Sequence, residues 1–409
     1  MKFAFDSYVS CHADDLRVAA PPKKHCRLLY LIGQLHSGGS ERQLYYLLEN
    51  MDRDRYRPAV VVWNYCEGET YVPQIRKLGV PIHALPNVWT PSAKVGALRR
   101  LVRNLRPQII HSFSFYLNYA AYWSVRGSSV IAIGSMRSSF DLDKKVNGWF
   151  LGKLSARWPN TQIYNSSDGE SSALRSKSWF IPRQLLVVQN GVDLRRFSIT
   201  PIPATITSAL IVGVGSLVAI KRWDKLLTMA AELKWRGLDF DVQIVGSGPL
   251  RDQLDEKVRR LQISDRIVFR GHIDDIPSVL SSASLLVHTA DAEGTPNAVM
   301  EAMSCGRAVV ATDVGDVRFL VEDGKSGFVV DREDDAMLSE RVATLLTDGE
   351  LCRRMGEAGR VKAEREFGLD RLVCNTLNAY RSAGWKDSFE PPAESTGMDR
   401  NACLSRQTD

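Results

Sequence analysis

Residues 197–214 read Phe197-Ser-Ile-Thr-Pro-Ile-Pro-Ala-Thr-Ile-Thr-Ser208 followed directly by Ala209-Leu-Ile-Val-Gly-Val214. The first segment holds two prolines and many small polar residues, a composition that is typical of a linker. The second segment is a short apolar run, as expected for a buried strand of a parallel sheet. A buried strand that follows a linker indicates that a second domain begins at residue 209.

The same alternation of short apolar runs with helical stretches occurs on both sides of this linker. Ala93–Leu105 carries an apolar stripe at helical spacing and is closed by Pro107, and Glu41–Met51 also has a helical pattern. This alternation predicts βαβ units and a parallel sheet in each half. The predicted strands are residues 27–33, 59–63, 109–111, 130–133, 162–164 and 185–188, then 209–214, 242–245, 266–269, 285–288, 308–311 and 327–330.

We therefore expect two doubly wound, Rossmann-like α/β domains that face each other across a cleft, with ligands bound at the carboxyl ends of the strands. The predicted order is a loose N-terminal extension (1–25), a first domain (26–198), the linker (199–208) and a second domain (209–368). Residues 386–409 are polar and are predicted to be a disordered tail, because they offer little apolar surface to bury.

The net charge of +6 is unevenly distributed along the 409 residues. Residues 1–200 hold 27 Lys and Arg against 14 Asp and Glu, whereas residues 201–409 hold 26 against 33. The first half therefore has a surplus of 13 positive charges and is the half expected to meet an anionic partner, such as a lipid-linked phosphate or an anionic membrane surface.

The cysteine pattern and the hydropathy bear on the compartment. Seven scattered cysteines without a C-x-x-C pair argue against a disulfide framework and a zinc site, and favour a reducing compartment. Residues 1–10 show no secretory signal, and no run approaches the roughly 18 apolar residues of a spanning helix. We expect a cytoplasmic protein that is either free or peripheral on the cytoplasmic face of the membrane.

The sharpest local signal is Ala292-Glu-Gly-Thr-Pro-Asn-Ala-Val-Met-Glu-Ala-Met-Ser-Cys-Gly306. Pro296 suits the first turn of a helix, and Thr295 or Asn297 suits its cap. Such a helix would direct the free backbone amides of residues 294–297 at the mouth of the cleft, where amides of this kind bind a diphosphate.

Two carboxylates belong to the same segment. Glu293 would precede the helix and Glu301 would lie about one turn inside it. Carboxylates hold vicinal hydroxyls by accepting their hydrogen bonds, so one is suited to a sugar and the other to a ribose. The alternative interpretation is a plain capped helix with two solvated acids.

Glycine-containing turns follow three strands of the second half. Gly215 and Ser216 precede Lys221 and Arg222, so that backbone and a point charge can approach a phosphate together. The other two turns are Gly246-Ser-Gly248 and Gly271-His272. None completes the G-x-G-x-x-G pattern, which disfavours a nicotinamide dehydrogenase, and each turn alone could serve structure only.

The first half offers weaker candidates. Gly38-Gly39-Ser-Glu-Arg-Gln43 follows the first strand and opens a helix, which allows a close backbone approach to a ligand. His111 at a strand end and Arg137 after Gly134-Ser-Met136 are candidate acceptor or phosphate contacts, although a structural role is the default for each. A basic helix stripe, with a solvated face as its default interpretation and anionic lipid as the alternative, comprises Lys94, Arg99, Arg100, Arg103 and Arg106.

Together these segments resemble the retaining glycosyltransferase family 4, whose members have the GT-B fold. The resemblance extends over about residues 27–385, and the ordered series is far more specific than any one match. The matching segments are residues 38–43, 190–193, 214–221, 244–249, 271–272, 293–301, 302–315 and 323–330.

The resemblance implies that the second domain binds a UDP-, GDP- or ADP-linked sugar and that the first domain binds the acceptor. Glu301 matches the residue that holds ribose hydroxyls, Glu293 matches the one that holds donor-sugar hydroxyls, and Lys221 matches the lysine on the diphosphate; Glu293 and Lys221 are the catalytic candidates. The remaining residues assigned to the donor site are Gly39, Gly215, Ser216, Arg222, Gly246, Gly248, His272, Gly294, Thr295, Pro296 and Asn297.

The family has no D-x-D metal site, so the resemblance implies no bound metal ion and no other cofactor. Lys221 and the helix-end amides would then stabilise the charge of the leaving group. Residues 369–385 resemble the terminal helix that crosses back to the first domain.

This chain departs from the family pattern at two places. Ser216 stands where members commonly have an arginine, which leaves Arg222 or Arg137 to compensate. Residues 134–137 occupy the region where members often have a histidine, so no catalytic histidine is assigned.

The predicted function is retaining transfer of a sugar to a lipid-linked, polysaccharide or oligosaccharide acceptor with an α-linkage, in bacterial surface polysaccharide synthesis. The two glutamates are expected to bind the donor and not to act as the carboxylate pair of a glycosidase. Two alternatives stay open, a non-catalytic sugar-nucleotide-binding protein of the same fold and a nucleotide-sugar 2-epimerase, which Glu293 and Glu301 disfavour. A nucleic-acid partner is not expected, because the basic residues lack interleaved aromatics.

Overall fold

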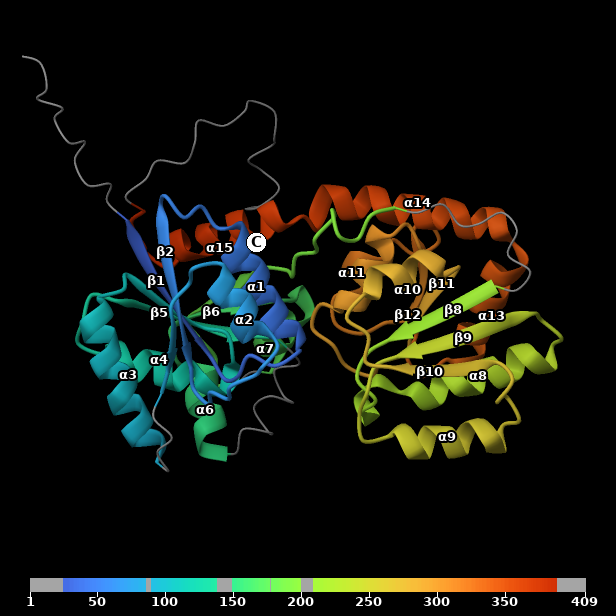
Figure 1. Cartoon of the computed structure of the whole chain (residues 1–409), viewed down its shortest axis with the longest axis horizontal. Coiled ribbons are helices and arrows are strands. Elements are labelled where there is room, and N and C mark those ends of the chain that lie inside the picture. Colours follow the sequence, from blue (N-terminus) through green and yellow to red (C-terminus); the bar gives the residue numbers. More distant parts are fainter. Residues whose placement is uncertain (1–24, 86–89, 138–148, 177, 200–208, 388–409) are drawn as a thin grey trace, which may run out of the picture.

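The computed structural model describes residues 25–85, 90–137, 149–176, 178–199 and 209–387. These residues form two α/β domains that lie side by side (Figure 1), each built on a parallel sheet. The expected pair of Rossmann-like domains is thereby confirmed. The predicted extension, except residue 25, nearly all of the predicted linker, and the tail beyond residue 387 lie outside the described residues.

The first domain is built on a seven-stranded parallel sheet with the order β3-β2-β1-β4-β5-β6-β7. Neighbouring residues of β1 point to opposite faces, and both faces are buried: Leu28 and Tyr30 pack on one side, and Leu29 and Leu31 on the other. The strands are β1 (Cys26–Ile32), β2 (Tyr56–Val62), β3 (Ile82–Ala84), β4 (Ile109–Ser112), β5 (Ile131–Met136), β6 (Thr161–Tyr164) and β7 (Gln184–Val187).

Helices cover both faces of this sheet. Helices α1, α2 and α15 pack on one face, and α3 and α4 pack on the other. Their bounds are α1 (Gly39–Asn50), α2 (Tyr71–Lys77), α3 (Pro91–Leu105), η1 (Phe115–Leu117), α4 (Asn118–Val125), α6 (Trp149–Arg157), α7 (Ser167–Arg175) and α15 (Leu369–Ser382).

The second domain has a six-stranded parallel sheet with the order β10-β9-β8-β11-β12-β13. Its strands are β8 (Ala209–Val214), β9 (Phe240–Val245), β10 (Ile267–Gly271), β11 (Leu285–His288), β12 (Ala308–Thr312) and β13 (Gly327–Val330). Its helices are η2 (Ala219–Lys221), α8 (Trp223–Trp235), α9 (Arg251–Arg260), α10 (Ile276–Ser282), α11 (Asn297–Ser304), α12 (Val317–Leu320), α13 (Asp335–Thr347) and α14 (Gly349–Glu366).

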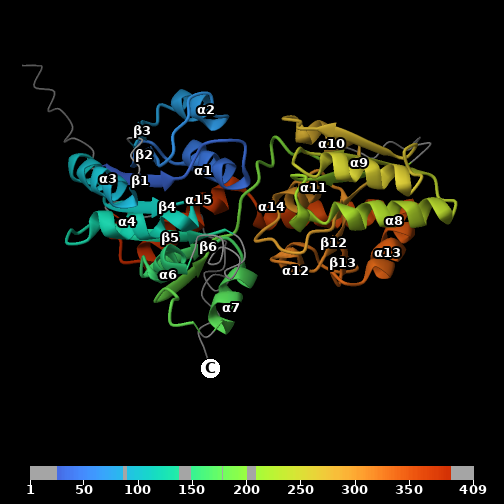
Figure 2. The same ribbon diagram turned by 90° about the horizontal axis from the view of Figure 1, so that it is seen from below.

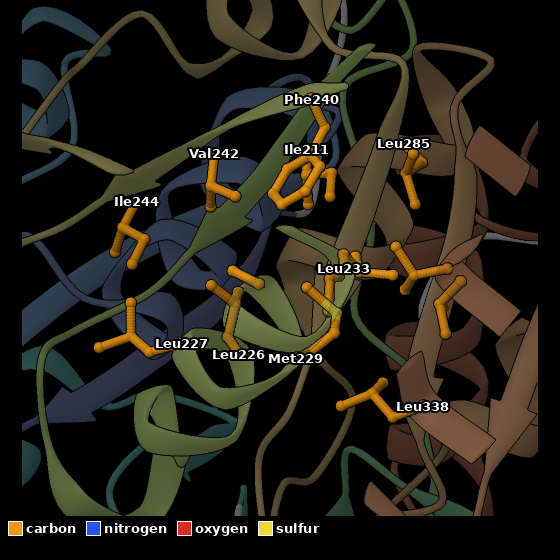
Figure 3. Packing of buried hydrophobic residues seen from close by; sticks show 14 of the residues in the cluster. Ile211, Leu226, Leu227, Met229, Leu233, Phe240, Val242, Ile244, Leu285 and Leu338 are labelled. Atoms are coloured by element: carbon orange, nitrogen blue, oxygen red, sulfur yellow. The ribbon is translucent and has the colours of Figure 1, made fainter. Parts of the chain in front are cut away.

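The second domain has a core on each face of its sheet, one against helices α8, α9 and α13 and the other against α10, α11 and α12. Figure 3 shows Ile211 and Val242 of the sheet above Leu226 and Leu233 of α8, with Leu338 of α13 closing the lower side. Tight burial on both faces leaves only the strand ends available for polar groups, and this places the functional loops at the sheet edge.

The last two helices join the domains a second time. Helix α14 runs along the second domain and α15 continues along the first (Figure 1), so that Leu372, Leu377 and Tyr380 belong to the first domain's core. The described chain continues to Asp387, whose carboxylate accepts hydrogen bonds from Tyr56 (3.0 Å) and Arg381 (2.7 Å). Residues 386 and 387, predicted to be part of the tail, are therefore attached to the first domain.

The basic stripe on α3 is divided by the structure. Lys94 is buried and donates hydrogen bonds to the Trp63 carbonyl (2.9 Å) and to Asn64 (2.8 Å), so it does not belong to an exposed basic face. The other four basic residues of the stripe are exposed: Arg99, Arg100, Arg103 and Arg106. Among the helices that the structure describes, none combines the length and the apolar character needed to cross a membrane.

Candidate active site

A cleft of about 740 Å³ lies between the two domains. The loops that follow β1, β5, β6 and β7 line it from the first domain, and those that follow β8, β9, β10 and β11 line it from the second. These loops leave the carboxyl ends of the strands, as is usual for ligand sites of doubly wound folds. Figure 2 shows α1 of the first domain and α11 of the second at the facing edges of the two domains.

Glu301 extends from α11 into the cleft and pairs with Arg42 of α1, on the opposite domain. The Glu301 side chain is buried, and this burial raises the pKa of its carboxyl, although the Arg42 guanidinium acts in the opposite direction. The residue predicted to bind ribose thus lies in the cleft, where an arginine from the other domain already holds it.

Glu293 belongs to a second charged cluster. Its Oε1 accepts hydrogen bonds from the Lys221 ammonium and from Nε2 of His288 (3.2 Å). Burial alone would raise the pKa of Glu293, but the hydrogen bond from His288 and the charge of Lys221 lower it to about 2. Glu293 is therefore ionised at neutral pH and is suited to accept hydrogen bonds from a ligand's hydroxyls.

Helix α11 begins at Asn297, with Pro296 as its N-cap residue and no side-chain capping bond. The predicted capping role of Thr295 or Asn297 was wrong. Thr295 instead donates to the Asn165 carbonyl of the first domain, and Asn297 Oδ1 accepts from Asn190 (3.0 Å). The backbone N–H groups in the first turn of α11 have no carbonyl within the helix to which they can donate, so they are suited to bind an anion.

Side chains from the first domain hold residues 294–297 from across the cleft. The Gln43 side chain donates a hydrogen bond to the Gly191 carbonyl and accepts one from the Gly191 amide, both at 2.8 Å. It also donates to Asn297 Oδ1 at 3.4 Å. A Cβ atom on Gly294 would lie 2.5 Å from Asn165 Oδ1, and one on Gly39 would lie 2.9 Å from Asn297 Nδ2. These two glycines therefore allow the close approach of the domains.

The glycine turns of the second domain differ in their roles. Gly246 lines the cleft with a positive φ of 143°, and a Cβ there would lie 1.9 Å from the Gly215 carbonyl oxygen. Gly248 lies outside the cleft lining and packs against the backbone of Leu217, which a Cβ would meet at 2.5 Å. The structure therefore places Gly248 outside the cleft, whereas Gly215, Ser216 and His272 line it.

Arg222 does not reach the cleft. Its guanidinium pairs with Asp291 (2.9 Å) and with Asp224 (3.0 Å), and it is not among the residues that line the cleft. Two carboxylates therefore already engage Arg222, and the structure does not bring it together with Ser216 in the cleft.

Arg137 does line the cleft from the first domain. Its guanidinium lies over the Phe113 ring at 4.2 Å and donates to Asn190 at 3.4 Å, and it forms no ion pair with any residue that the structure describes. Burial lowers the pKa of Arg137 to about 10, so the side chain stays charged at neutral pH. Arg137 is therefore a charged residue of the cleft, whereas Ser216 is an uncharged one.

His111 is buried inside the first domain and does not line the cleft. It lies within β4, fully buried, with Nδ1 2.7 Å from the Tyr380 hydroxyl of α15 and Nε2 2.9 Å from the Ser135 hydroxyl. Burial keeps the pKa of His111 well below its ordinary value, so the ring is neutral. Helix α15 covers the strand end that carries His111, so the structure does not bring this residue to the cleft.

Arg42 and His288 are among the cleft residues that the sequence did not predict. Arg42 stands inside the quoted segment 38–43, but nothing local indicates that it faces Glu301. His288 is the last residue of a buried apolar strand, and a polar residue at that position is a signal that could have found it.

Each domain of this chain matches a known protein family. A family described as "Glycosyl transferases group 1" matches residues 201–362, and one described as "Glycosyltransferase Family 4" matches residues 37–196. The two matches follow the two domains of the structure, one each.

Curated relatives resemble this chain over part of its length. An alpha-D-kanosaminyltransferase of Streptomyces kanamyceticus is 31% identical over 177 residues, which are 43% of this chain and 46% of that protein. WcaL of Escherichia coli (strain K12), named for colanic acid biosynthesis, is 32% identical over 212 residues, or 48% of this chain and 52% of that protein. The matched region spans about half the length of these relatives.

Solved structures resemble the chain over nearly its whole described length. HepE of Anabaena in complex with UDP-glucose has a TM-score of 0.76 at 18% identity and covers 88% of this chain and 100% of that one. The lipopolysaccharide outer core galactosyltransferase WaaB has a TM-score of 0.71 at 16% identity, with 87% and 99% covered. These likenesses show the GT-B fold, and the chain has a Glycosyltransferase Family 4 domain followed by a Glycosyl transferases group 1 domain.

Proposed function

We propose that this protein transfers a sugar from an α-linked nucleoside diphosphate sugar to a hydroxyl of a lipid-linked or glycan acceptor, with retention of configuration. The observation that carries the proposal is the arrangement of two glutamates, the half-buried Glu293 and the buried Glu301, on either side of the first turn of α11 in one cleft. Anionic diphosphate suits the helix end, and hydroxyl groups suit the carboxylates.

In this proposal the donor lies along α11. Glu301 accepts hydrogen bonds from the ribose hydroxyls once Arg42 is displaced or shared, and Glu293 accepts them from the sugar. The diphosphate lies between these carboxylates, against the first amides of α11 and the Lys221 ammonium. When the sugar's anomeric bond to the diphosphate breaks, Lys221 and Arg137 stabilise the charge on the leaving phosphate, without a metal ion.

Two further observations support the donor and the acceptor class. The solved neighbour HepE binds UDP and UDP-glucose, and one relative is named for colanic acid biosynthesis. The first domain, which faces the acceptor in this proposal, carries the surplus of positive charge, and this surplus suits a phosphate-bearing lipid carrier. We therefore place the reaction in the assembly of a bacterial surface polysaccharide.

The test is calorimetric titration of UDP and of UDP-, GDP- and ADP-sugars into the wild-type protein and two variants. Glu301→Gln removes a ribose contact, so binding of nucleotide and nucleotide sugar should weaken equally, by about tenfold. Glu293→Gln removes a sugar contact, so nucleotide-sugar binding should weaken by a similar factor while nucleotide binding does not. The exposed Glu333→Gln serves as the matched control.

The proposal fails if no donor binds, or if both variants behave like Glu333→Gln. If a donor binds, turnover with that donor in labelled form identifies the acceptor. The anomeric configuration of the product, measured by NMR, tests retention. Donor binding without turnover on any of the lipid-linked and glycan acceptors would show that the protein is a non-catalytic binding protein and not a transferase.

A further inference from the structure

A second cavity, of about 560 Å³, lies in the first domain, away from the cleft. Arg27, the second residue of β1, and Ile131, the first of β5, line it together with Gln108, which precedes β4. The cleft lies at the carboxyl ends of these strands, so this cavity lies at the opposite edge of the same sheet. None of the residues assigned to the donor site lines it.

All charged residues that line this cavity are cationic. Neither aspartate nor glutamate lines it, and its six cationic residues form no ion pair with any residue that the structure describes. We call it the basic cavity after these six residues, which are Arg27, Arg99, Arg103, Arg106, Arg126 and Lys386. Like charges gathered without counter-charges repel one another, and a bound anion would relieve this repulsion.

Two of the guanidinium groups are held in place by backbone carbonyls. Arg27 Nε donates to the Arg106 carbonyl at 2.8 Å, and Arg99 Nη2 donates to the Arg126 carbonyl at 3.0 Å. The Arg126 guanidinium lies over the Trp123 ring at 4.7 Å. Each of these contacts leaves N–H donors unused, since a guanidinium has five, and fixed guanidinium groups bind phosphate in a two-pronged manner.

The C-terminal end of the described chain forms one wall of the basic cavity. Trp385 and Lys386 follow α15, and Trp385 Nε1 donates to Gln108 Oε1 at 3.3 Å. The Trp385 ring also packs edge-on against Tyr380 at 6.2 Å. A ligand in the cavity would thus touch both the sheet and the segment that ends the crossover helix.

We propose that the basic cavity binds a phosphate-bearing polyanion, at a site separate from the donor cleft. A ligand with several negative oxygens can meet several of these cations at once, and phosphate groups match the geometry of arginine. The phosphates belong either to a free polyphosphorylated solute or to the headgroup of an anionic lipid. Binding of either fastens Trp385 and Lys386 against the first domain, and this raises the unfolding temperature of that domain. The proposal does not depend on the transferase reaction.

The experiment compares two variants of neighbouring arginines on α3. Arg103→Gln removes a cation that lines the cavity, and Arg100→Gln makes the same change of charge on an exposed residue that does not line it. Neither side chain has a hydrogen bond or ion pair to another described residue, so both variants should fold. Inorganic pyrophosphate is titrated into each by calorimetry, with Lys221→Ala as a check for binding in the donor cleft.

A second arm sediments the same proteins with vesicles of phosphatidylcholine alone or with about a third phosphatidylglycerol. A soluble ligand is indicated by pyrophosphate binding that Arg103→Gln weakens about tenfold while Arg100→Gln and Lys221→Ala change it less than about twofold. A headgroup is indicated if the same pattern appears only with anionic vesicles. Absence of binding in both arms, or equal losses in Arg100→Gln and Arg103→Gln, overturns the proposal.

Discussion

At the level of single residues, the cleft is organised by carboxylates that already have partners. Arg42 holds Glu301 from the opposite domain, and Lys221 with His288 holds Glu293. A buried carboxylate without such partners would protonate, and it would then lose part of its capacity as a hydrogen-bond acceptor. The partners therefore favour the ionised form of both glutamates, and a ligand of Glu301 would have to compete with Arg42.

Ser216 offers a test of how the diphosphate is neutralised. Ser216 is exposed and lines the cleft near Lys221, so Ser216→Arg should place a second cation near the diphosphate. We expect donor binding to strengthen about fivefold, equivalent to about 1 kcal/mol, and the gain to shrink at high salt because the site is open to water. Calorimetry at about 20 and 200 mM NaCl measures both effects.

The uncharged Ser216→Gln is the control for added side-chain size. A gain of the same size with Ser216→Gln, or a gain with Ser216→Arg that salt leaves unchanged, would contradict the electrostatic explanation.

At the level of secondary-structure elements, α15 is the helix whose role depends most on its partners. It follows the second domain in the chain, yet Leu372, Leu377 and Tyr380 pack into the first domain's core. The hydroxyl of Tyr380 also lies against His111, so the helix covers the strand end that carries this histidine. Helix α15 therefore makes the first domain depend on the C-terminal part of the chain.

Truncating one side chain of α15 should show this dependence. Leu377→Ala leaves a cavity in the first domain's core, and we expect it to lower the free energy of unfolding by about 2–4 kcal/mol. Cys374→Ala, on the exposed side of the same helix, should change it by less than about 0.5 kcal/mol. Urea unfolding followed by tryptophan fluorescence measures both. Equal midpoints for the two variants would show that α15 is not part of the core.

At the level of the whole molecule, the two domains also meet beside the cleft at Asp316. Its carboxylate accepts a hydrogen bond from the Asp168 amide of the first domain (3.1 Å), next to Thr295 and Asn165. Burial raises the pKa of Asp316 to about 6, although hydrogen bonds from the backbone of α7 oppose the change. The contact between the domains therefore contains a carboxylate that is costly to ionise.

The sign of the pH effect follows from this pKa. The folded protein binds a proton at Asp316 up to about pH 6 and the unfolded chain only up to about pH 4, so stability from this group is lost as the pH rises through 6. Asp316→Asn cannot ionise and should be more stable than wild type at pH 8, by up to about 3 kcal/mol. Below pH 4 this advantage should vanish.

Thermal unfolding of Asp316→Asn and of the exposed control Asp241→Asn at pH 4 and pH 8 measures the difference. An Asp316→Asn protein that is less stable than wild type at pH 8 would show that the ionised carboxylate contributes more through its hydrogen bonds than its burial costs.

The sequence by itself determined the class of fold and the position of most elements, because the hydrophobic period of a buried strand is a local property. Every predicted strand is present, and β3 (Ile82–Ala84) was missed because it is three half-buried or exposed residues without an apolar run. The helix that carries Glu301 and the preceding Glu293 could also be predicted, since the proline and both carboxylates lie within one short segment, although its cap residue could not.

Only the tertiary structure decided which of these residues meet. Arg42 and Glu301, or Gln43 and Asn297, come from different domains, and their contact depends on how the two sheets are placed across the cleft. His111 became a core residue because α15 folds back over its strand end. Periodicity records which face of an element is buried, but it does not record what covers that face, and this is the reason why the partners were not predictable from the sequence.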